Sequence, residues 1–426
     1  MEAGKACLRN PRLAATCIFR AVAENQPGHK NQNRMKTPIT LEQFATLCRE
    51  FIQFSCSQAE NQGQPDPLQS SFDHLAVSLF RLQFAHNTAY RRLCELRNIT
   101  VKQVGHWFEI PSAPASSFKL VDMSCLPPEQ RDLLFCSSGT TGQQPSRHYH
   151  NDNSLLVYES SLLPWFKRHL RLEPEILSGS NASDPVLLSL TPPAAEVPHS
   201  SLTHMLATIE RRMKWSDALF AGRVQNGGWG LNIQAVANCL QRATESNRLV
   251  VILGTAFSFV HLLDHLSAVG LQFQLPRGSR VMETGGYKGR SRALTRPELH
   301  ALITDRLGIA SENIVCEYGM TELSSQAYDR AVSATAAANV PPNPTRRFRF
   351  PPWARVQIIS PETGQEVAEG ETGLIRVFDL ANVYSVLAIQ TEDLAVRSGN
   401  GFELIGRPKT VEPRGCSLNV AVGVRL

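Results

Sequence analysis

Four hydroxyl side chains and two glycines fill six consecutive positions, Ser137-Ser138-Gly139-Thr140-Thr141-Gly142. Glycine lets backbone amides approach a ligand closely, and successive amides in such a turn form a concave anion-binding site. The pattern predicts a phosphate-binding loop, although the lysine and the glycine spacing of the Walker motif are missing. The alternative is an ordinary polar turn, because the same residue types dominate turns.

Three further polar motifs follow, each next to a predicted strand. Glu283-Thr284-Gly285-Gly286 offers two glycines against which a flat ring can lie. Glu317-Tyr318-Gly319-Met320-Thr321-Glu322 puts an aromatic face, a glycine, a hydroxyl and a carboxylate into one turn after the strand Asn313–Cys316. Thr391-Glu392-Asp393 and Gly406-Arg407 bracket the last predicted hairpin. An acid there can accept hydrogen bonds from ribose hydroxyls, and an arginine can reach the same nucleotide.

Taken in order, these motifs resemble the core motifs of the adenylate-forming superfamily, which includes acyl-CoA synthetases and firefly luciferase. The resemblance implies ATP and Mg²⁺ as cofactors, with the hexamer 137–142 on the ATP phosphates and Gly285, Gly286 and Tyr318 on adenine. It also implies that Glu322 binds Mg²⁺ and takes part in catalysis and that Arg407 is a second catalytic residue. Asp393 would contact the ribose, and Gly319 and Thr321 would make further nucleotide contacts. The alternatives are tight-turn packing for Gly285, Gly286 and Tyr318 and a surface turn for Glu322. For Asp393 the alternative is a hairpin cap, and for Arg407 a solvated side chain.

A closer resemblance is to the acyl-protein synthetase (LuxE-type) of the bacterial luminescence fatty-acid reductase complex. It is carried by five phrases, which extend the similarity from about Leu41 to the C-terminus: Ile110-Pro111 through Phe118-Lys119, Ser146-Arg147-His148, Ser200-Ser201-Leu202 with Met205, Leu253-Gly254-Thr255-Ala256-Phe257, and Arg414-Gly415-Cys416-Ser417-Leu418. Only 19 residues follow Arg407 (426 − 407). The resemblance therefore implies a large-domain fold that lacks the usual mobile C-terminal domain and its catalytic lysine, and Lys409 lies too close to replace that group.

The same resemblance makes Cys416 the predicted acyl acceptor and third catalytic residue. A thiolate attacks activated acyl groups readily, and the neighbouring Arg414 favours the anion. The alternative is a buried cysteine in an apolar tail.

The predicted phosphate loop contains no lysine, so Arg147, Lys288 or Arg407 must share the neutralisation of the triphosphate. His148 and His204 are weaker candidates for a place beside the acyl carboxylate, with a structural role as the alternative.

The elements that must position these residues follow from hydrophobic periodicity. Leu41 to Ile99 reads as helical, and a Pro/Ser-rich connector, 111–117, leads to the hexamer. Strands are predicted at 186–190, 249–253, 280–282 and 313–316, and a capping box at Thr295–Glu298 opens a helix to about Leu307. Two β-hairpins follow, 354–359 with 372–378 and 394–397 with 402–405.

This alternation predicts an α/β fold with a parallel-rich sheet and a C-terminal antiparallel β module. The expected organisation is a disordered N-terminal extension over 1–40, an adenylating α/β core over 41–345, and a β-rich module with an acyl-acceptor tail over 346–426. Residues 1–34 read equally as a disordered tail, a weak targeting peptide or an extension before a start at Met35.

Composition narrows the class of protein. A net charge of +5 over 426 residues without a basic block argues against a nucleic-acid partner, and no run of about 18 uncharged apolar residues predicts a membrane span. The ten cysteines are scattered without metal-ligand spacing, which favours a reduced, cytoplasmic protein with buried thiols at Cys94, Cys239 and Cys316.

The predicted function is ATP-dependent activation of a long-chain fatty acid as acyl-AMP and transfer of the acyl group to the protein's own cysteine. The acyl group would then pass to a partner such as an acyl reductase or acyltransferase. The alternatives are a truncated carboxylate–CoA or carboxylate–carrier ligase, and a non-catalytic nucleotide-binding subunit. Acyl chain length, partner identity and oligomeric state do not follow from the sequence.

Overall fold

The computed structural model describes residues 39–58, 67–137, 144–172, 184–225, 228–286, 291–330 and 346–407. Its helices are α3 (Leu41–Gln58), α4 (Pro67–His86), α5 (Thr88–Leu96), α6 (Ser117–Leu120), α7 (Asp152–Leu170), α9 (Ser201–Arg212), α10 (Ile233–Glu245), α11 (Ala256–Ala268) and α12 (Arg296–Leu307). None of the helices in these ranges is both long and apolar enough to cross a membrane.

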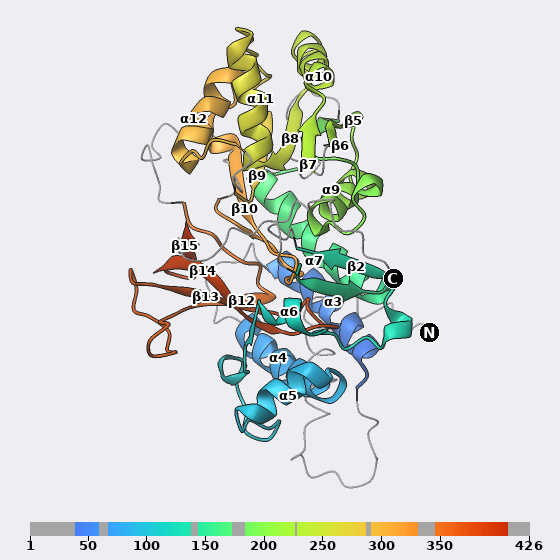
Figure 1. The fold of residues 1–426 in the computed structure, drawn as a ribbon, viewed down its shortest axis with the longest axis vertical. Helices are drawn as coiled ribbons and strands as arrows, with labels where there is room; N and C mark the ends of the chain where they lie inside the picture. The colour runs from blue at the N-terminus through green and yellow to red at the C-terminus, as the bar shows by residue number, and fades with distance from the viewer. Residues whose placement is uncertain are drawn as a thin grey trace.

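Two larger sheets organise this part of the chain, and they lie one above the other along the long axis of Figure 1. The upper one has the order β11-β10-β9-β8-β4-β5. Its strands are β4 (Val186–Ser189), β5 (Asp217–Phe220), β8 (Val250–Thr255), β9 (Arg280–Thr284), β10 (Ile314–Tyr318) and β11 (Ala327–Tyr328). Only β11 runs antiparallel to its neighbour.

The central strands of this sheet are apolar along most of their length because both faces are covered. Every residue of β4, β8, β9 and β10 is buried. In Figure 1, α10, α11 and α12 gather at the top of the molecule and α9 lies nearer its middle. Strands buried on both faces are typical of parallel α/β sheets. The predicted α/β fold with a parallel-rich sheet is confirmed.

Side-chain caps fix where the helices next to the site begin. Thr295 accepts a hydrogen bond from the amide of Glu298, whose carboxylate binds the Thr295 amide in return, so the predicted capping box is present. The helix ends at Gly308, whose φ of 67° suits glycine. Thr255 caps α11 with its hydroxyl, which accepts a hydrogen bond from the Ser258 amide at 3.2 Å.

The lower sheet consists of β1 (Ala113–Pro114), β12 (Ala354–Ile359), β13 (Thr372–Asp379), β14 (Ala388–Ser398) and β15 (Gly401–Gly406). The pairs β12–β13 and β14–β15 are the two antiparallel hairpins expected from the sequence. The 111–117 connector is more than a linker, because β1 pairs in parallel with β14 through Ala113 and Ile389. Two short hairpins, β2 (Leu133–Cys136) with β3 (Arg147–His150) and β6 (Gly222–Gln225) with β7 (Gly228–Leu231), complete the strands.

One hydrophobic core joins the N-terminal helices to the lower sheet. Phe44 of α3 and Phe80 of α4 belong to the same buried cluster as Val377 of β13 and Phe402 of β15. Packing therefore crosses the expected boundary at residue 345. The division into 1–40, 41–345 and 346–426 stays a prediction, and residues 1–38 lie outside the described ranges.

Candidate active site

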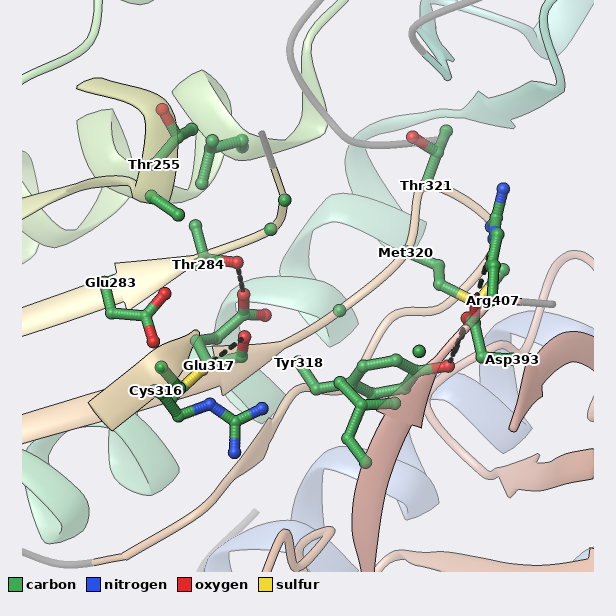
Figure 2. Close-up of a pocket in the computed structure, with 18 of the residues that line it drawn as sticks. Thr255, Glu283, Thr284, Cys316, Glu317, Tyr318, Met320, Thr321, Asp393 and Arg407 are labelled. Atoms are coloured by element: carbon green, nitrogen blue, oxygen red, sulfur yellow. Dashed lines mark hydrogen bonds and ion pairs between the residues drawn. The ribbon is translucent and has the colours of Figure 1, made fainter. Parts of the chain in front are cut away.

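A cavity of about 380 Å³ lies at the C-terminal ends of β8, β9 and β10, and β14 and the residues after β15 close its other side. Ligands of open α/β sheets bind at this edge of the strands. Figure 2 shows Glu317 pointing to Thr284 on one side and Tyr318 pointing to Asp393 on the other. The described residues of the predicted site all line this cavity: Ser137, Gly285, Gly286, Tyr318, Gly319, Thr321, Glu322, Asp393 and Arg407. The others, Ser138, Gly139, Thr140, Thr141, Gly142 and Cys416, lie outside the described residues.

Tyr318, Asp393 and Arg407 form one hydrogen-bonded group. The Tyr318 hydroxyl donates to Asp393 Oδ2 at 2.9 Å, and Arg407 Nε donates to Asp393 Oδ1 at 2.8 Å. Asp393 is only 7% exposed, yet it lines the cavity. A carboxylate has about four acceptor positions, so Asp393 keeps capacity for further donors. The side chain of Arg407 extends past Asp393 toward the side of the cavity that carries Thr321 (Figure 2).

A β-bulge aims Asp393 into the site. Gln390 pairs with Arg376 and Leu394 with Leu374, so three residues of β14 stand opposite Ile375 alone. Bulges of this kind redirect side chains and often lie next to active sites. Thr391 stabilises the bulge, since its hydroxyl donates to the Ile375 carbonyl at 2.8 Å and accepts from the Asp393 amide at 3.2 Å. The sequence suggested that residues 391–393 precede the last hairpin. They lie instead within its first strand.

Two glycines shape the walls. Gly285 has a φ of 72°, a left-handed conformation that favours glycine, and a Cβ there would meet nothing within 4 Å. At Gly319 a Cβ would collide with Glu317 Oε1, so that carboxylate packs directly over the backbone. Backbone is therefore exposed to the cavity at Gly285, as a flat ring requires.

The strands reach further than the sequence suggested. Glu283 and Thr284 are the last residues of β9, and Glu317 and Tyr318 the last of β10, whereas these residues were expected to follow the strands. The apolar run Ile314-Val315-Cys316 continues into Glu317 because that carboxylate has a partner inside the fold. Thr284 donates its hydroxyl hydrogen bond to Glu317.

Buried acids at this end of the cavity were not predicted. Glu283 is 3% exposed and lies 3.3 Å from His300 Nε2 of α12. Burial raises the pKa of Glu317 to about 7, and the charge of Glu283 adds to the rise while the Thr284 hydrogen bond opposes it. The signal in the sequence was the occurrence of two glutamates at the ends of neighbouring apolar strands.

Glu317→Gln is expected to flatten the pH dependence of folding stability. The pKa of Glu317 rises on folding from 4.5 to about 7. Its contribution to stability is therefore fully present below about pH 4.5 and is lost as the pH rises through about 7. Relative to the variant, the wild type should lose up to about 3 kcal/mol of unfolding free energy over this range. Urea denaturation between about pH 5 and 8 measures the slope, and equal slopes would contradict the prediction. Glu245→Gln, on the exposed side of α10, is the control and should keep the wild-type slope.

The ends of the predicted phosphate loop are joined at its base. The Ser137 amide donates to the Ser146 carbonyl at 3.1 Å, and the Ser146 amide donates to the Ser137 hydroxyl at 2.8 Å. Ser137 thus closes the loop and lines the cavity at the same time. Arg147 is held by Asp122 at 3.1 Å and does not line the cavity, and Lys288 lies outside the described residues.

Neither candidate histidine lines the cavity. His148 lies 3% exposed, with Nδ1 2.8 Å from the Thr321 carbonyl, and burial lowers its pKa to about 4. His204 packs against Phe135 and Tyr158, and burial lowers its pKa as well. Both side chains are therefore neutral near pH 7, and the structure favours the structural alternative for them.

The chain is similar in sequence to one protein family and to two ligases from luminous bacteria. The family described as "Acyl-protein synthetase, LuxE" matches residues 230–423. The long-chain-fatty-acid–luciferin-component ligase of Vibrio harveyi is 20% identical over 365 residues, covering 82% of this chain and 86% of that protein. The enzyme of the same name from Aliivibrio fischeri is 20% identical over 369 residues, covering 82% and 87%.

Solved structures show the same fold. 2-Hydroxyisobutyryl-CoA ligase in its postadenylation state, in complex with 2-HIB-AMP, superimposes with a TM-score of 0.55 at 13% identity, covering 79% of this chain and 67% of that one. An open conformation of that ligase in complex with 2-HIB-AMP and CoA gives a TM-score of 0.52 at 15% identity, covering 82% and 80%. The chain therefore has the fold of the adenylate-forming ligases and is similar in sequence to the acyl-protein synthetases of the LuxE type.

Proposed function

We propose that this chain joins a long-chain fatty acid to AMP at the expense of ATP and then transfers the acyl group to its own Cys416. The observation that carries the first half is the single cavity that gathers every described residue of the predicted nucleotide site. The names of the sequence relatives, long-chain-fatty-acid–luciferin-component ligases, support the choice of acid.

The cavity suits a nucleoside phosphate. Its volume, about 380 Å³, falls in the usual range of small-molecule sites. The Tyr318 ring and the backbone at Gly285 and Gly286 offer two surfaces for the base. Asp393 can accept from ribose hydroxyls with the positions that Tyr318 and Arg407 leave open.

The donor set at Glu322 fits Mg²⁺. This carboxylate lines the cavity while its residue is only 2% exposed, and Mg²⁺ prefers one or two carboxylates together with phosphate oxygens. When bound, Mg²⁺ would neutralise charge on the phosphates. Arg407 supplies a fixed positive charge on the same side as Thr321.

In the first step, a carboxylate oxygen of the fatty acid attacks the α-phosphorus of ATP. The bond to the bridging oxygen of the β-phosphate breaks, leaving acyl-AMP and pyrophosphate. The role of the chain in this step is to position the reactants and to stabilise charge. In this proposal Ser137 and residues 138–142 hold the phosphates, and Asp393 binds the ribose.

In the second step, a thiolate attacks the acyl carbonyl of acyl-AMP, and AMP leaves. The structure describes seven of the ten cysteines, and all but Cys56 are buried, including Cys94, Cys239 and Cys316 as predicted. Burial raises the pKa of each described cysteine, to about 11 for Cys56 and Cys94. Thiols of this kind react poorly. This supports an acceptor among Cys7, Cys17 and Cys416, of which Cys416 has an adjacent basic residue, Arg414. A partner reductase or acyltransferase would then take the acyl group.

The test is intact-protein mass spectrometry after incubation with MgATP and a mixture of fatty acids, together with fatty-acid-dependent ATP–pyrophosphate exchange. We expect exchange with a long-chain acid and a mass increase of one acyl group that hydroxylamine removes. Exchange without protein acylation would favour a carboxylate–CoA or carrier ligase. Absence of exchange with every acid would favour a non-catalytic nucleotide-binding subunit.

A further inference from the structure

Asp379 is a buried acid that the proposed reaction does not use. It is the last residue of β13, it is 0% exposed, and it does not line the cavity. An ionised side chain in such a place is costly unless hydrogen bonds satisfy it. Its partners therefore indicate what it does.

All four hydrogen bonds to the Asp379 carboxylate come from two short segments. Oδ2 accepts from the amides of Ser324 at 2.9 Å and Ser325 at 2.8 Å. Oδ1 accepts from the Ser325 hydroxyl at 2.7 Å and from the Ala381 amide at 3.0 Å. Burial raises the pKa of Asp379, and these four bonds oppose that rise.

The Ser325 bond is the end of a directed chain of donors. Trp353 Nε1 can only donate, and it does so to the Ser161 hydroxyl at 2.8 Å. Ser161 and Ser325 are 2.9 Å apart through their hydroxyls, so Ser161 donates to Ser325, which donates to Asp379. Such chains polarise each bond in one direction. Asp379 is thus required as an acceptor.

A second side chain from the same turn reaches Glu322 itself. Asn382 Nδ2 donates to the Glu322 carbonyl at 2.9 Å, and Asn382 Oδ1 accepts from the Ser324 hydroxyl at 2.5 Å. The backbone amide of Asn382 donates to the backbone carbonyl of Asp379 at 3.1 Å. Asp379 and Asn382 together hold Glu322, Ser324 and Ser325 at three backbone and two hydroxyl groups.

This attachment matters because residues 319–326 belong to neither a helix nor a strand. Their shape depends on side-chain contacts, and His148 of β3 also binds this segment, with its Nδ1 2.8 Å from the Thr321 carbonyl. The lower sheet thereby fixes a segment that leads directly from β10 into the cavity.

We propose that Asp379 is a positioning residue for Glu322, through its bonds to Ser324 and Ser325 and the bond of Asn382 to the Glu322 carbonyl. The inference rests on the proposed function, since it takes Glu322 as the Mg²⁺ ligand. Partners of ligating carboxylates that do not touch the metal typically change metal affinity or activity by 10–100-fold when removed.

Asp379→Asn tests this in the full-length protein. In the variant, the NH₂ group of asparagine takes the place of the oxygen that accepts from the Ser324 and Ser325 amides, so these bonds are lost. Because the segment that carries Glu322 then loses its support, we expect the Mg²⁺ concentration for half-maximal ATP–pyrophosphate exchange to rise about tenfold. Asp329→Asn is the matched control, a buried aspartate that binds Arg346 and the Cys316 amide instead. It should lower the melting temperature without moving the Mg²⁺ midpoint.

A double-mutant cycle separates positioning from simple destabilisation. If Asp379 acts through Glu322, then Asp379→Asn adds no further shift in a Glu322→Gln background, whereas independent effects would add. Asn382→Ala removes the bond to the Glu322 carbonyl and leaves the bonds from the Ser324 and Ser325 amides to Asp379 in place. It should shift the Mg²⁺ midpoint in the same direction as Asp379→Asn. It carries the test if Asp379→Asn does not fold.

The two failures can be told apart. A wild type without exchange would overturn the proposed function. A Glu322→Gln variant with a normal Mg²⁺ midpoint would overturn the metal-binding role of Glu322 on which the inference rests. A shifted midpoint in Glu322→Gln with normal midpoints in Asp379→Asn and Asn382→Ala would overturn the inference alone.

Discussion

Replacing Glu322 by glutamine is expected to slow fatty-acid-dependent ATP–pyrophosphate exchange by about 10²–10³-fold, the usual effect of removing one preorganised electrostatic contact. The substitution keeps the size of the side chain and removes its charge. Because Mg²⁺ prefers carboxylates to amides, the Mg²⁺ concentration needed for half-maximal exchange should rise as well. Initial rates of exchange measured over a Mg²⁺ titration give both quantities.

An exposed glutamate away from the cavity provides the control for Glu322→Gln. Glu362 lies exposed in the turn between β12 and β13, so Glu362→Gln makes the same change of charge far from the cavity. It should leave the exchange rate and the Mg²⁺ midpoint as in the wild type. A Glu322→Gln variant that matches Glu362→Gln in both would remove Glu322 from the metal site.

Cys416→Ser should abolish the hydroxylamine-sensitive acyl-enzyme while ATP–pyrophosphate exchange continues at close to the wild-type rate. The two half-reactions separate here because the thiol takes part only after acyl-AMP has formed. A serine hydroxyl is a far weaker nucleophile than a thiolate unless a base activates it. Intact mass before and after hydroxylamine treatment, with exchange measured in parallel, checks both halves.

Two sets of cysteine variants sharpen this result. Cys316→Ser alters the one described thiol that lines the cavity, and Cys56→Ser alters the one that is not buried. Both should still be acylated, because the raised pKa of each thiol keeps it protonated. Cys7→Ser and Cys17→Ser test the remaining cysteines. Acylation of Cys416→Ser at the wild-type rate would contradict the acyl-acceptor proposal.

The expectations from local sequence that succeeded depend on neighbours in the chain. The capping box at Thr295–Glu298 and the hairpin strands 354–359 and 372–378 are present as expected. These features arise from hydrogen bonds and periodicity within a few residues. The order of four motifs likewise pointed to the adenylate-forming fold, and five further phrases pointed to relatives of the LuxE type. The comparisons confirmed both.

The expectations that needed correction depend on distant partners. Glu317 ends a strand because Thr284, on a neighbouring strand, donates a hydrogen bond to its buried carboxylate. Asp393 lies inside β14 because a bulge opposite Ile375 turns it toward Tyr318. Ala113 forms a strand because Ile389, far along the chain, pairs with it. The secondary-structure propensities of single residues do not depend on such distant contacts, so they could not predict them.

By itself, the sequence determined the fold class and picked out residues that line one cavity, and it predicted the kind of ligand that they bind. Residue types fix the chemistry, since a carboxylate, an aromatic ring or a hydroxyl keeps its capacity wherever it lies. Only the tertiary structure decided how those groups work together. It brought Asp393 to Tyr318 and Arg407, placed Glu317 in surroundings that raise its pKa, and set Asp379 beneath the segment that carries Glu322. These effects come from burial and from hydrogen bonds between distant segments, which exist only once the two sheets have packed together.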